Sequence, residues 1–336
     1  MKRAGNLYHL IAEPENLRLA FLKAARGKRA KPEVRAYAAC LDGNLRLLQE
    51  QLLAHCMDVG HYHFFTVHDP KERIICAASF PERVLHHAVM NICEPVLEHY
   101  AIYDSYACRA GKGMHAAVLR SQEFARRFPW YLKLDIRKYF DSIRQETLIS
   151  LLQRRFKDKA VLQLIRTILK TYSTEPGRGL PIGNLISQHL ANFYLGHLDH
   201  RVKETLHVRG YVRYMDDFVL FGDDKATLKA HLTAVRDFLE VELGLDLKDN
   251  VQLNRCGRGL PFLGYRVFPG RLALGPRARL RFARKLRGYE GEWLSGRWSD
   301  SDLQRHMESL LSYVRFADTL FLRRHIINRF SVVAGI

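Results

Sequence analysis

The segment GYVRYMDDFVLFG, from Gly210 to Gly222, constrains the fold of this chain more than any other stretch. Two short runs rich in aromatic and β-branched residues flank a turn that contains two adjacent carboxylates, Asp216 and Asp217. Such runs favour strands, so the segment is predicted to form a β-hairpin with both carboxylates at its tip. Like charges held side by side repel each other, and a divalent metal ion bound through oxygen would relieve that repulsion. A solvated acidic turn is the simpler alternative.

Size and charge narrow the interpretation of the whole chain. It has 336 residues, of which 47% are hydrophobic and 26% are charged, enough for several sub-domains with substantial cores. The formal net charge is +18, and the excess of Lys and Arg is spread through the chain. A surface of this sign attracts phosphates and releases their counterions, so a polyanionic partner is predicted. The alternative is a basic protein without such a partner.

The cysteines and the N-terminal sequence indicate the cellular compartment in which the protein is expected. Six cysteines are scattered through the chain without a Cys-x-x-Cys pair, a pattern that predicts neither a zinc site nor a disulfide framework. Reduced thiols in a cytosol are expected. The N-terminus has no apolar run typical of a signal peptide, and no stretch approaches membrane-spanning length. A soluble, cytoplasmic protein with no membrane partner is therefore predicted.

Hydrophobic periodicity divides the chain into helices and strands. Helices are predicted within 14–58 (two of them), at 81–99, after the Gly-rich basic loop 105–115, within 145–172 (two), after Asn184 as far as Val202, at 224–243 and beyond 271. Strands are predicted at 61–67, 73–77, 130–135 and 245–249, with a short hairpin at 262–267. Residues 177–184 form a Gly/Pro loop whose last residue, Asn184, is expected to cap the next helix.

The central elements follow the order strand, helices, hairpin, helix, strand. This order is close to a split βαβ layout, in which an antiparallel sheet backed by helices brings the end of the first strand beside the central hairpin. The first strand ends at Asp135, so Asp135 is expected to meet Asp216 and Asp217. From residue 271 onward the chain is predicted to be helical and basic.

Four segments stand in one order: LKLDIRKYF at 132–140, LPIGNLISQ at 180–188, YMDD at 214–217 and FLGY at 262–265. Together they resemble the motifs of reverse transcriptases, and the resemblance runs from about residue 60 to the C-terminus. It implies an RNA-directed DNA polymerase with an α+β, right-hand architecture. Fingers would occupy residues 1–130, a palm with the split βαβ antiparallel sheet residues 131–270, and a basic helical thumb residues 271–336.

The resemblance also implies a two-metal site. Nucleotidyl transfer needs an activated primer 3′-hydroxyl and a neutralised pyrophosphate, which two Mg²⁺ ions supply, with Mn²⁺ as a substitute. Asp135, Asp216 and Asp217, with the carbonyl of Ile136, would be the ligands. Further roles are implied in holding the dNTP (Lys71, Arg73, Phe140, Ile182, Gly183), in fidelity or template contact (Ile182, Ser187, Gln188) and in gripping the primer (Phe262, Leu263, Gly264, Tyr265).

Several of these residues have simpler explanations. Phe140 could be an ordinary core aromatic, Lys71 a solvated hairpin tip, and Phe262 to Tyr265 no more than packing. Intron-type enzymes place a lysine shortly before the primer-grip hairpin, where it can serve as a general acid. Lys248 stands two to three positions too early for that role, so a solvated lysine at a strand edge is the favoured interpretation.

Two departures from the common pattern point to a sub-family. Most reverse transcriptases have Gln where this chain has Ile182, and Pro where it has Gln188. Together with the compact length, these departures resemble the reverse transcriptases of diversity-generating retroelements. Such enzymes copy a template RNA into cDNA with misincorporation at adenines, and work with a small basic accessory variability protein. An alkyl side chain at position 182 lacks the hydrogen bonds of an amide, so we hypothesise that it relaxes base selection; a tolerated packing change is the alternative.

Other functions remain open at this point. A defence-associated or intron-derived bacterial reverse transcriptase is the alternative within enzymes, although no maturase, endonuclease or RNase H extension is visible after the predicted thumb. A non-catalytic RNA-binding scaffold is the alternative outside enzymes, and the three clustered acids argue against it. The expected partners are template RNA, an RNA/DNA duplex, dNTPs and the accessory protein.

Overall fold

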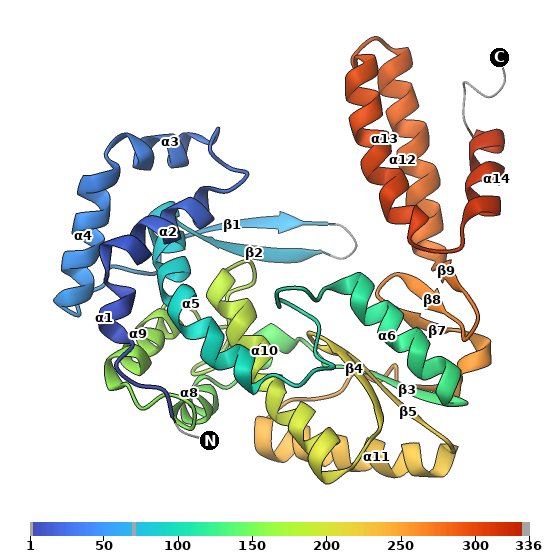
Figure 1. The fold of residues 1–336 in the computed structure, drawn as a ribbon, viewed down its shortest axis with the longest axis horizontal. Coiled ribbons are helices and arrows are strands. Elements are labelled where there is room, and N and C mark those ends of the chain that lie inside the picture. Colours follow the sequence, from blue (N-terminus) through green and yellow to red (C-terminus); the bar gives the residue numbers. More distant parts are fainter. Residues whose placement is uncertain (1–2, 69–71, 331–336) are drawn as a thin grey trace.

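A computed structural model describes residues 3–68 and 72–330 of the chain (Figure 1). Its N-terminal region is helical: α1 (Tyr8–Ile11), α2 (Pro14–Ala25), α3 (Pro32–Ala39) and α4 (Leu41–Leu53). The prediction of two helices within 14–58 is wrong, because α3 lies between the expected pair. Pro32 stands at the start of α3, where its fixed φ favours a first turn. Cys40, with φ −120°, then separates α3 from α4.

A two-stranded hairpin follows, formed by β1 (Tyr62–Val67) and β2 (Arg73–Ala78). We call it the fingers hairpin. Figure 1 shows it extending from the N-terminal helices toward the C-terminal ones. After it, α5 (Phe80–Tyr100) packs against α2, and a loop leads into α6 (Met114–Arg127). These elements agree with the predicted hairpin and helices.

The central sheet contains four antiparallel strands in the order β4-β5-β3-β6. They are β3 (Trp130–Asp135), β4 (Gly210–Tyr214), β5 (Asp217–Gly222) and β6 (Gln252–Arg255). Leu132 and Leu220 on one face belong to a large buried cluster that includes residues of helices behind the sheet. Tyr131 and Val219 on the other face belong to a second cluster with α6. The mixed helix-and-sheet architecture predicted from the sequence is confirmed.

The last strand of this sheet is not where the sequence predicted it. Residues 245–249 make only an isolated bridge, between Leu247 and Ile136, and the regular strand β6 begins at Gln252. The difference has a physical reason: Lys248 donates its backbone N–H to the Asp135 carbonyl at 2.8 Å, so this stretch covers the end of β3 before the chain pairs along it.

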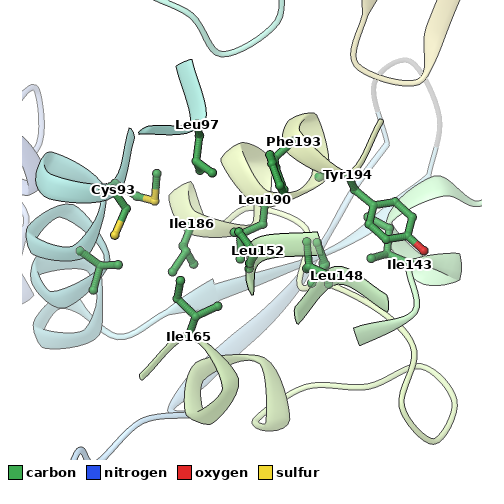
Figure 2. Packing of buried hydrophobic residues seen from close by; sticks show 14 of the residues in the cluster. Cys93, Leu97, Ile143, Leu148, Leu152, Ile165, Ile186, Leu190, Phe193 and Tyr194 are labelled. Atoms are coloured by element: carbon green, nitrogen blue, oxygen red, sulfur yellow. The ribbon is translucent and has the colours of Figure 1, made fainter. Parts of the chain in front are cut away.

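Helices between β3 and β5 form the large core behind the sheet. They are α7 (Tyr139–Ser142), α8 (Gln145–Gln153), α9 (Lys159–Lys170) and α10 (Leu185–His200), which continues as the π-helix η1 (Arg201–Thr205). After β5 come α11 (Lys225–Phe238) and the π-helix η2 (Leu239–Leu243). Figure 2 shows Ile186 and Leu190 of α10 packed among Leu97, Leu152 and Ile165 from α5, α8 and α9. Helix α10 therefore lies at the centre of the molecule.

The C-terminal part adds a second small sheet and a group of helices. A 3₁₀ turn, η3 (Cys256–Arg258), leads to β7 (Leu260–Phe262), β8 (Tyr265–Val267) and β9 (Leu272–Leu274), and then to α12 (Pro276–Leu294), α13 (Asp300–Arg315) and α14 (Leu320–Phe330). The predicted hairpin at 262–267 thus gains a third strand. Within residues 3–68 and 72–330, no helix is long and apolar enough to span a membrane.

Candidate active site

The catalytic candidates lie on neighbouring strands of the central sheet. Tyr214 pairs with Asp217, so the turn of the β4–β5 hairpin consists of Met215 and Asp216, and Asp217 is the first residue of β5. Met215 has φ +56°, a value that is uncommon for a residue other than glycine. Asp135, the last residue of β3, lies directly opposite Asp217 in the antiparallel register. The sheet therefore brings the three carboxylates together.

The environment of the acidic pair disfavours charge on both groups at once. Burial raises the pKa of Asp216, and the nearby carboxylate of Asp135 raises it further. Burial likewise raises the pKa of Asp217 to about 7, although the neighbouring ammonium group of Lys133 opposes that shift. Carboxylates that repel each other in a poorly hydrated site gain most from a cation placed between them.

Two lysines that the sequence prediction did not assign to the site lie against these carboxylates. Lys133 Nζ lies 3.0 Å from Asp217 Oδ1, and Lys248 Nζ forms an ion pair with Asp135 Oδ1. Lys248 is ion-paired with Asp135 and lies before β6, so its interpretation as a solvated lysine at a strand edge is wrong. Lys133 could have been found from the sequence, because it stands two residues before Asp135 and so faces the same side of β3.

The chemistry of this donor set fits divalent metal ions. Carboxylate oxygens are the ligands that hard cations prefer, and Asp217 Oδ1 makes no hydrogen bond within the described chain, although Lys133 lies at ion-pair distance. In the part of the chain that the structure describes, no group of three His, Cys, Asp or Glu side chains is preformed for a metal ion. Asp135 and Asp217 are paired with lysines, which an incoming ion would displace.

A buried arginine supports the turn from behind. Arg213 on β4 is fully buried and donates to both carboxylate oxygens of Asp199, at 2.6 and 2.5 Å. The same guanidinium donates to Asn192 Oδ1 at 2.7 Å and to the carbonyl of Met215 at 3.1 Å. Tyr211 adds a hydroxyl hydrogen bond to Asp199 at 2.8 Å. The only sequence signal for this network is a charged residue in an otherwise apolar strand.

Three of the candidates for holding the nucleotide, Phe140, Ile182 and Gly183, lie in or beside the loop 180–184, next to the base of the fingers hairpin. The Leu180 N–H donates to the Phe140 carbonyl at 2.9 Å, and the Cys76 N–H of β2 donates to the Ile182 carbonyl at 2.8 Å. Arg73 is exposed, and its positive charge opposes the rise in the pKa of Asp216 that burial and Asp135 cause. Lys71 lies outside the described residues.

Asn184 occupies the N-cap position of α10, but its side chain does not cap the helix. The expected capping bond is therefore wrong: Oδ1 instead accepts a hydrogen bond from the Ala78 N–H of β2, at 3.1 Å. A tertiary partner has replaced the local one.

The remaining candidates differ in accessibility. Ser187 is a buried residue of α10 and is 1% exposed, whereas Gln188 is half-buried, with Oε1 3.6 Å from the Cys108 thiol. Phe262 and Tyr265 are each 1% exposed in the second buried cluster. The turn formed by Leu263 and Gly264 is therefore the accessible part of the segment predicted to grip the primer.

The profile of the family described as "Reverse transcriptase (RNA-dependent DNA polymerase)" matches residues 68–266. Protein YkfC of Escherichia coli is 26% identical over 282 residues, covering 69% of this chain and 73% of its own length. The group II intron-encoded protein LtrA of Lactococcus lactis is 30% identical over 135 residues, covering 38% of this chain. Nuclear intron maturase 4 of Arabidopsis thaliana is 25% identical over 202 residues, covering 58%.

The matched region is a small part of the intron-related proteins: 22% of LtrA and 25% of nuclear intron maturase 4. Among solved structures, apo telomerase from Candida tropicalis superposes with a TM-score of 0.50 at 9% identity, covering 63% of this chain and 47% of that one. At this identity the likeness concerns the fold alone.

Proposed function

Because the chain belongs to the reverse transcriptase (RNA-dependent DNA polymerase) family, we propose that it copies an RNA template into DNA at the site formed by Asp135, Asp216 and Asp217. The observation that carries this proposal is the strand register, which sets Asp135 opposite Asp217 and one residue from the Asp216 turn. A solvated acidic turn would need neither the third carboxylate, Asp135, nor the buried Arg213–Asp199 pair that supports the turn.

Each part of the site has a role in this reaction. The three carboxylates, with the Ile136 carbonyl, would hold two Mg²⁺ or Mn²⁺ ions, which supply an activated 3′-hydroxyl and neutralise the leaving pyrophosphate. Lys133 and Lys248 balance the carboxylate charge until the ions bind. Arg73 on the fingers hairpin would orient the triphosphate of the dNTP, together with Lys71. Phe140, half-buried beside the loop 180–184, would lie under the sugar.

Template RNA and the RNA/DNA duplex are the proposed macromolecular partners. The first C-terminal helix, α12, exposes Arg277, Arg284 and Lys285, and cations at such positions follow a phosphate backbone. Affinity for the duplex should therefore fall steeply as the salt concentration rises. The helices α12 to α14 would form the thumb, with the fingers at 1–130 and the palm at 131–270.

Activity and binding can be separated by one pair of substitutions. Asp216→Ala with Asp217→Ala should abolish metal-dependent dNTP incorporation on a primed RNA, while RNA binding in a filter assay persists. If the wild-type protein extends no primer on any template with Mg²⁺ or Mn²⁺, a non-catalytic RNA-binding scaffold is the better explanation.

Within this family we assign the chain to the error-prone polymerases of diversity-generating retroelements, which misincorporate at adenines. Ile182 supports this assignment: its half-buried side chain lies beside the fingers hairpin, where a glutamine amide could contact the nucleotide or the template. The accessory variability protein would dock on the N-terminal helices or on the thumb. The similarity to intron-encoded proteins favours a second candidate, an accurate intron-derived or defence-associated enzyme.

Restoring the amide distinguishes these two candidates. Ile182→Gln should lower misincorporation opposite template adenines, measured by sequencing cDNA made from a defined RNA. Ile182→Leu is the matched control, because it changes the shape of the side chain without adding an amide. An unchanged error spectrum in Ile182→Gln, or a wild-type enzyme with few errors at adenines, would favour the second candidate.

A further inference from the structure

The fingers hairpin meets the loop 180–184 along a narrow line of contacts, which we call the seam. Two hydrogen bonds cross it: Cys76 N–H to the Ile182 carbonyl at 2.8 Å, and Ala78 N–H to Asn184 Oδ1 at 3.1 Å. Between them lies Gly183, with φ +113°, and a Cβ on this residue would stand 2.7 Å from Ile75 Cγ2. The strand and the loop are thus in direct contact, and Asn184 provides the side-chain hydrogen bond.

Beyond the seam the hairpin has little support. Residues 63–67 of β1 and residues 73 and 74 of β2 are exposed, and burial begins only near Cys76. Arg73 lies three residues from Cys76, a distance of about 10 Å along an extended strand. A tilt of about 10° at the seam would move Arg73 by roughly 2 Å on that lever. A small tilt at the seam therefore moves Arg73 by a distance that matters for contact with a nucleotide.

Asn184 bears a cost in its present position. It is 2% exposed, and its Nδ2 has no hydrogen-bond partner within the described chain. A buried, unsatisfied donor is unfavourable, and an asparagine at an N-cap would ordinarily use Oδ1 for its own helix. Asn184 forgoes the capping bond and instead holds β2. Stability of α10 alone does not account for that choice.

We propose that Asn184 is a positioning residue for nucleotide selection: its bond to Ala78 fixes the position of Arg73 on the hairpin relative to Ile182 on the loop. This inference rests on the proposed polymerase function and adds a determinant of specificity behind the nucleotide site. In this proposal a correctly paired dNTP contacts both residues, with its triphosphate against Arg73 and its base near Ile182. A loose seam would admit incorrect nucleotides more readily and hold correct ones less tightly.

The hairpin offers a matched control on its other strand. Tyr62 of β1 donates or accepts a hydrogen bond with Thr171 Oγ1 at 2.6 Å, and this bond does not involve the loop 180–184. Tyr62→Phe therefore removes one anchor of the same hairpin without touching the seam. Asn184→Ala removes the seam bond, and Asn184→Asp keeps an acceptor oxygen at the same place.

The decisive experiment combines nucleotide kinetics with hydrogen exchange on the full chain. Loss of one hydrogen bond corresponds to about a tenfold change in binding, so Asn184→Ala should raise KM for the correct dNTP about tenfold. Its kcat should change far less, and the ratio of incorrect to correct incorporation should rise. Asn184→Asp should restore both values toward wild type. Tyr62→Phe should leave the incorporation ratio unchanged.

Hydrogen exchange is measured without nucleotide, so its result does not depend on polymerase activity. Amides of residues 73–78 should exchange faster in Asn184→Ala than in wild type or in Asn184→Asp. If the amides of residues 73–78 exchange at the wild-type rate in Asn184→Ala, the proposal is wrong. A tenfold fall in kcat at an unchanged KM would also overturn it. A wild-type protein that incorporates no dNTP while exchange responds as expected would refute the proposed function instead.

Discussion

The two β-hairpins of this molecule are built in opposite ways. The β4–β5 hairpin is buried on both faces, and Arg213 braces its turn from within. The fingers hairpin β1–β2 is largely exposed and is fixed only near its base. Both are tied to one helix: Asn184 at the start of α10 holds β2, while Asn192 and Asp199 further along it hold β4.

The difference matches what each hairpin would do. Carboxylates that share metal ions need fixed separations, and only a buried scaffold supplies them without rearrangement. A strand that receives a nucleotide and releases pyrophosphate has to adjust in every cycle, so weak attachment suits it. Because α10 is bonded to both hairpins, this one helix fixes the position of each hairpin relative to the other.

The sharpest way to break this contrast is to remove the brace of the buried hairpin. Arg213→Met leaves the Asp199 carboxylate buried and unpaired, so it should lower the free energy of unfolding by about 3–5 kcal/mol and abolish most polymerase activity. Denaturant unfolding and primer extension measure the two effects.

A double variant separates stability from positioning. Arg213→Met combined with Asp199→Leu removes the unpaired charge and should recover most of the lost stability. Activity should stay low, because the Met215 carbonyl still lacks its donor. Wild-type activity in the double variant would show that the network only stabilises the fold.

Sequence reasoning succeeded for one hairpin and its partners because the signals there are local. Alternating apolar residues mark β4 and β5, and topology rules then bring Asp135 beside them. It failed where a distant group overrides a local preference. The sequence predicts Asn184 to be a helix cap, but in the structure it bonds to Ala78. It predicts Lys248 to be a solvated lysine, but in the structure it pairs with Asp135. Side-chain partners of this kind, separated by more than a hundred residues, have no periodic signature.

The buried carboxylate of Asp217 in the acidic turn should lower the free energy of unfolding when it is ionised, an effect that the exposed fingers hairpin does not share. The pKa of Asp217 in the folded chain, about 7, lies above the usual value of 3.8, so the folded protein binds this proton more tightly than the unfolded chain. The ionised group therefore destabilises the fold increasingly as pH rises from about 4 to 7. Asp217→Asn should be more stable than wild type at pH 8 in EDTA, by up to about 4 kcal/mol.

Two conditions check that assignment. Well below the usual aspartate pKa of 3.8, the stabilities of Asp217→Asn and wild type should converge, because the carboxyl is then protonated in both the folded and unfolded states. Added Mg²⁺ should stabilise the wild type and leave Asp217→Asn less affected. A difference in thermal unfolding that is independent of pH would contradict the stated cause.

A methyl group at the seam tests the fingers hairpin itself. Gly183→Ala meets both an unfavourable φ of +113° and the close Ile75 methyl, so it should cost roughly 1–3 kcal/mol and raise KM for dNTPs. Gly113→Ala is the control, since Gly113 has a similar positive φ, +120°, but nothing lies within 4 Å of its Cβ position. The difference between the two variants in urea unfolding isolates the contact with β2. Equal effects would mean that the loop and the strand do not press on each other.

The smallest effect is expected on the outer half of the fingers hairpin. Ile74 is 64% exposed, so Ile74→Ala should change the free energy of unfolding by less than about 0.5 kcal/mol. Val219 is fully buried in the other hairpin, so Val219→Ala should lower the free energy of unfolding by about 2 kcal/mol. If Ile74→Ala nevertheless weakens binding of primed RNA, the exposed apolar surface contacts nucleic acid. A loss of stability comparable to that of Val219→Ala would instead show that the fingers hairpin packs more closely than its exposure indicates, and the contrast between the two hairpins would fail.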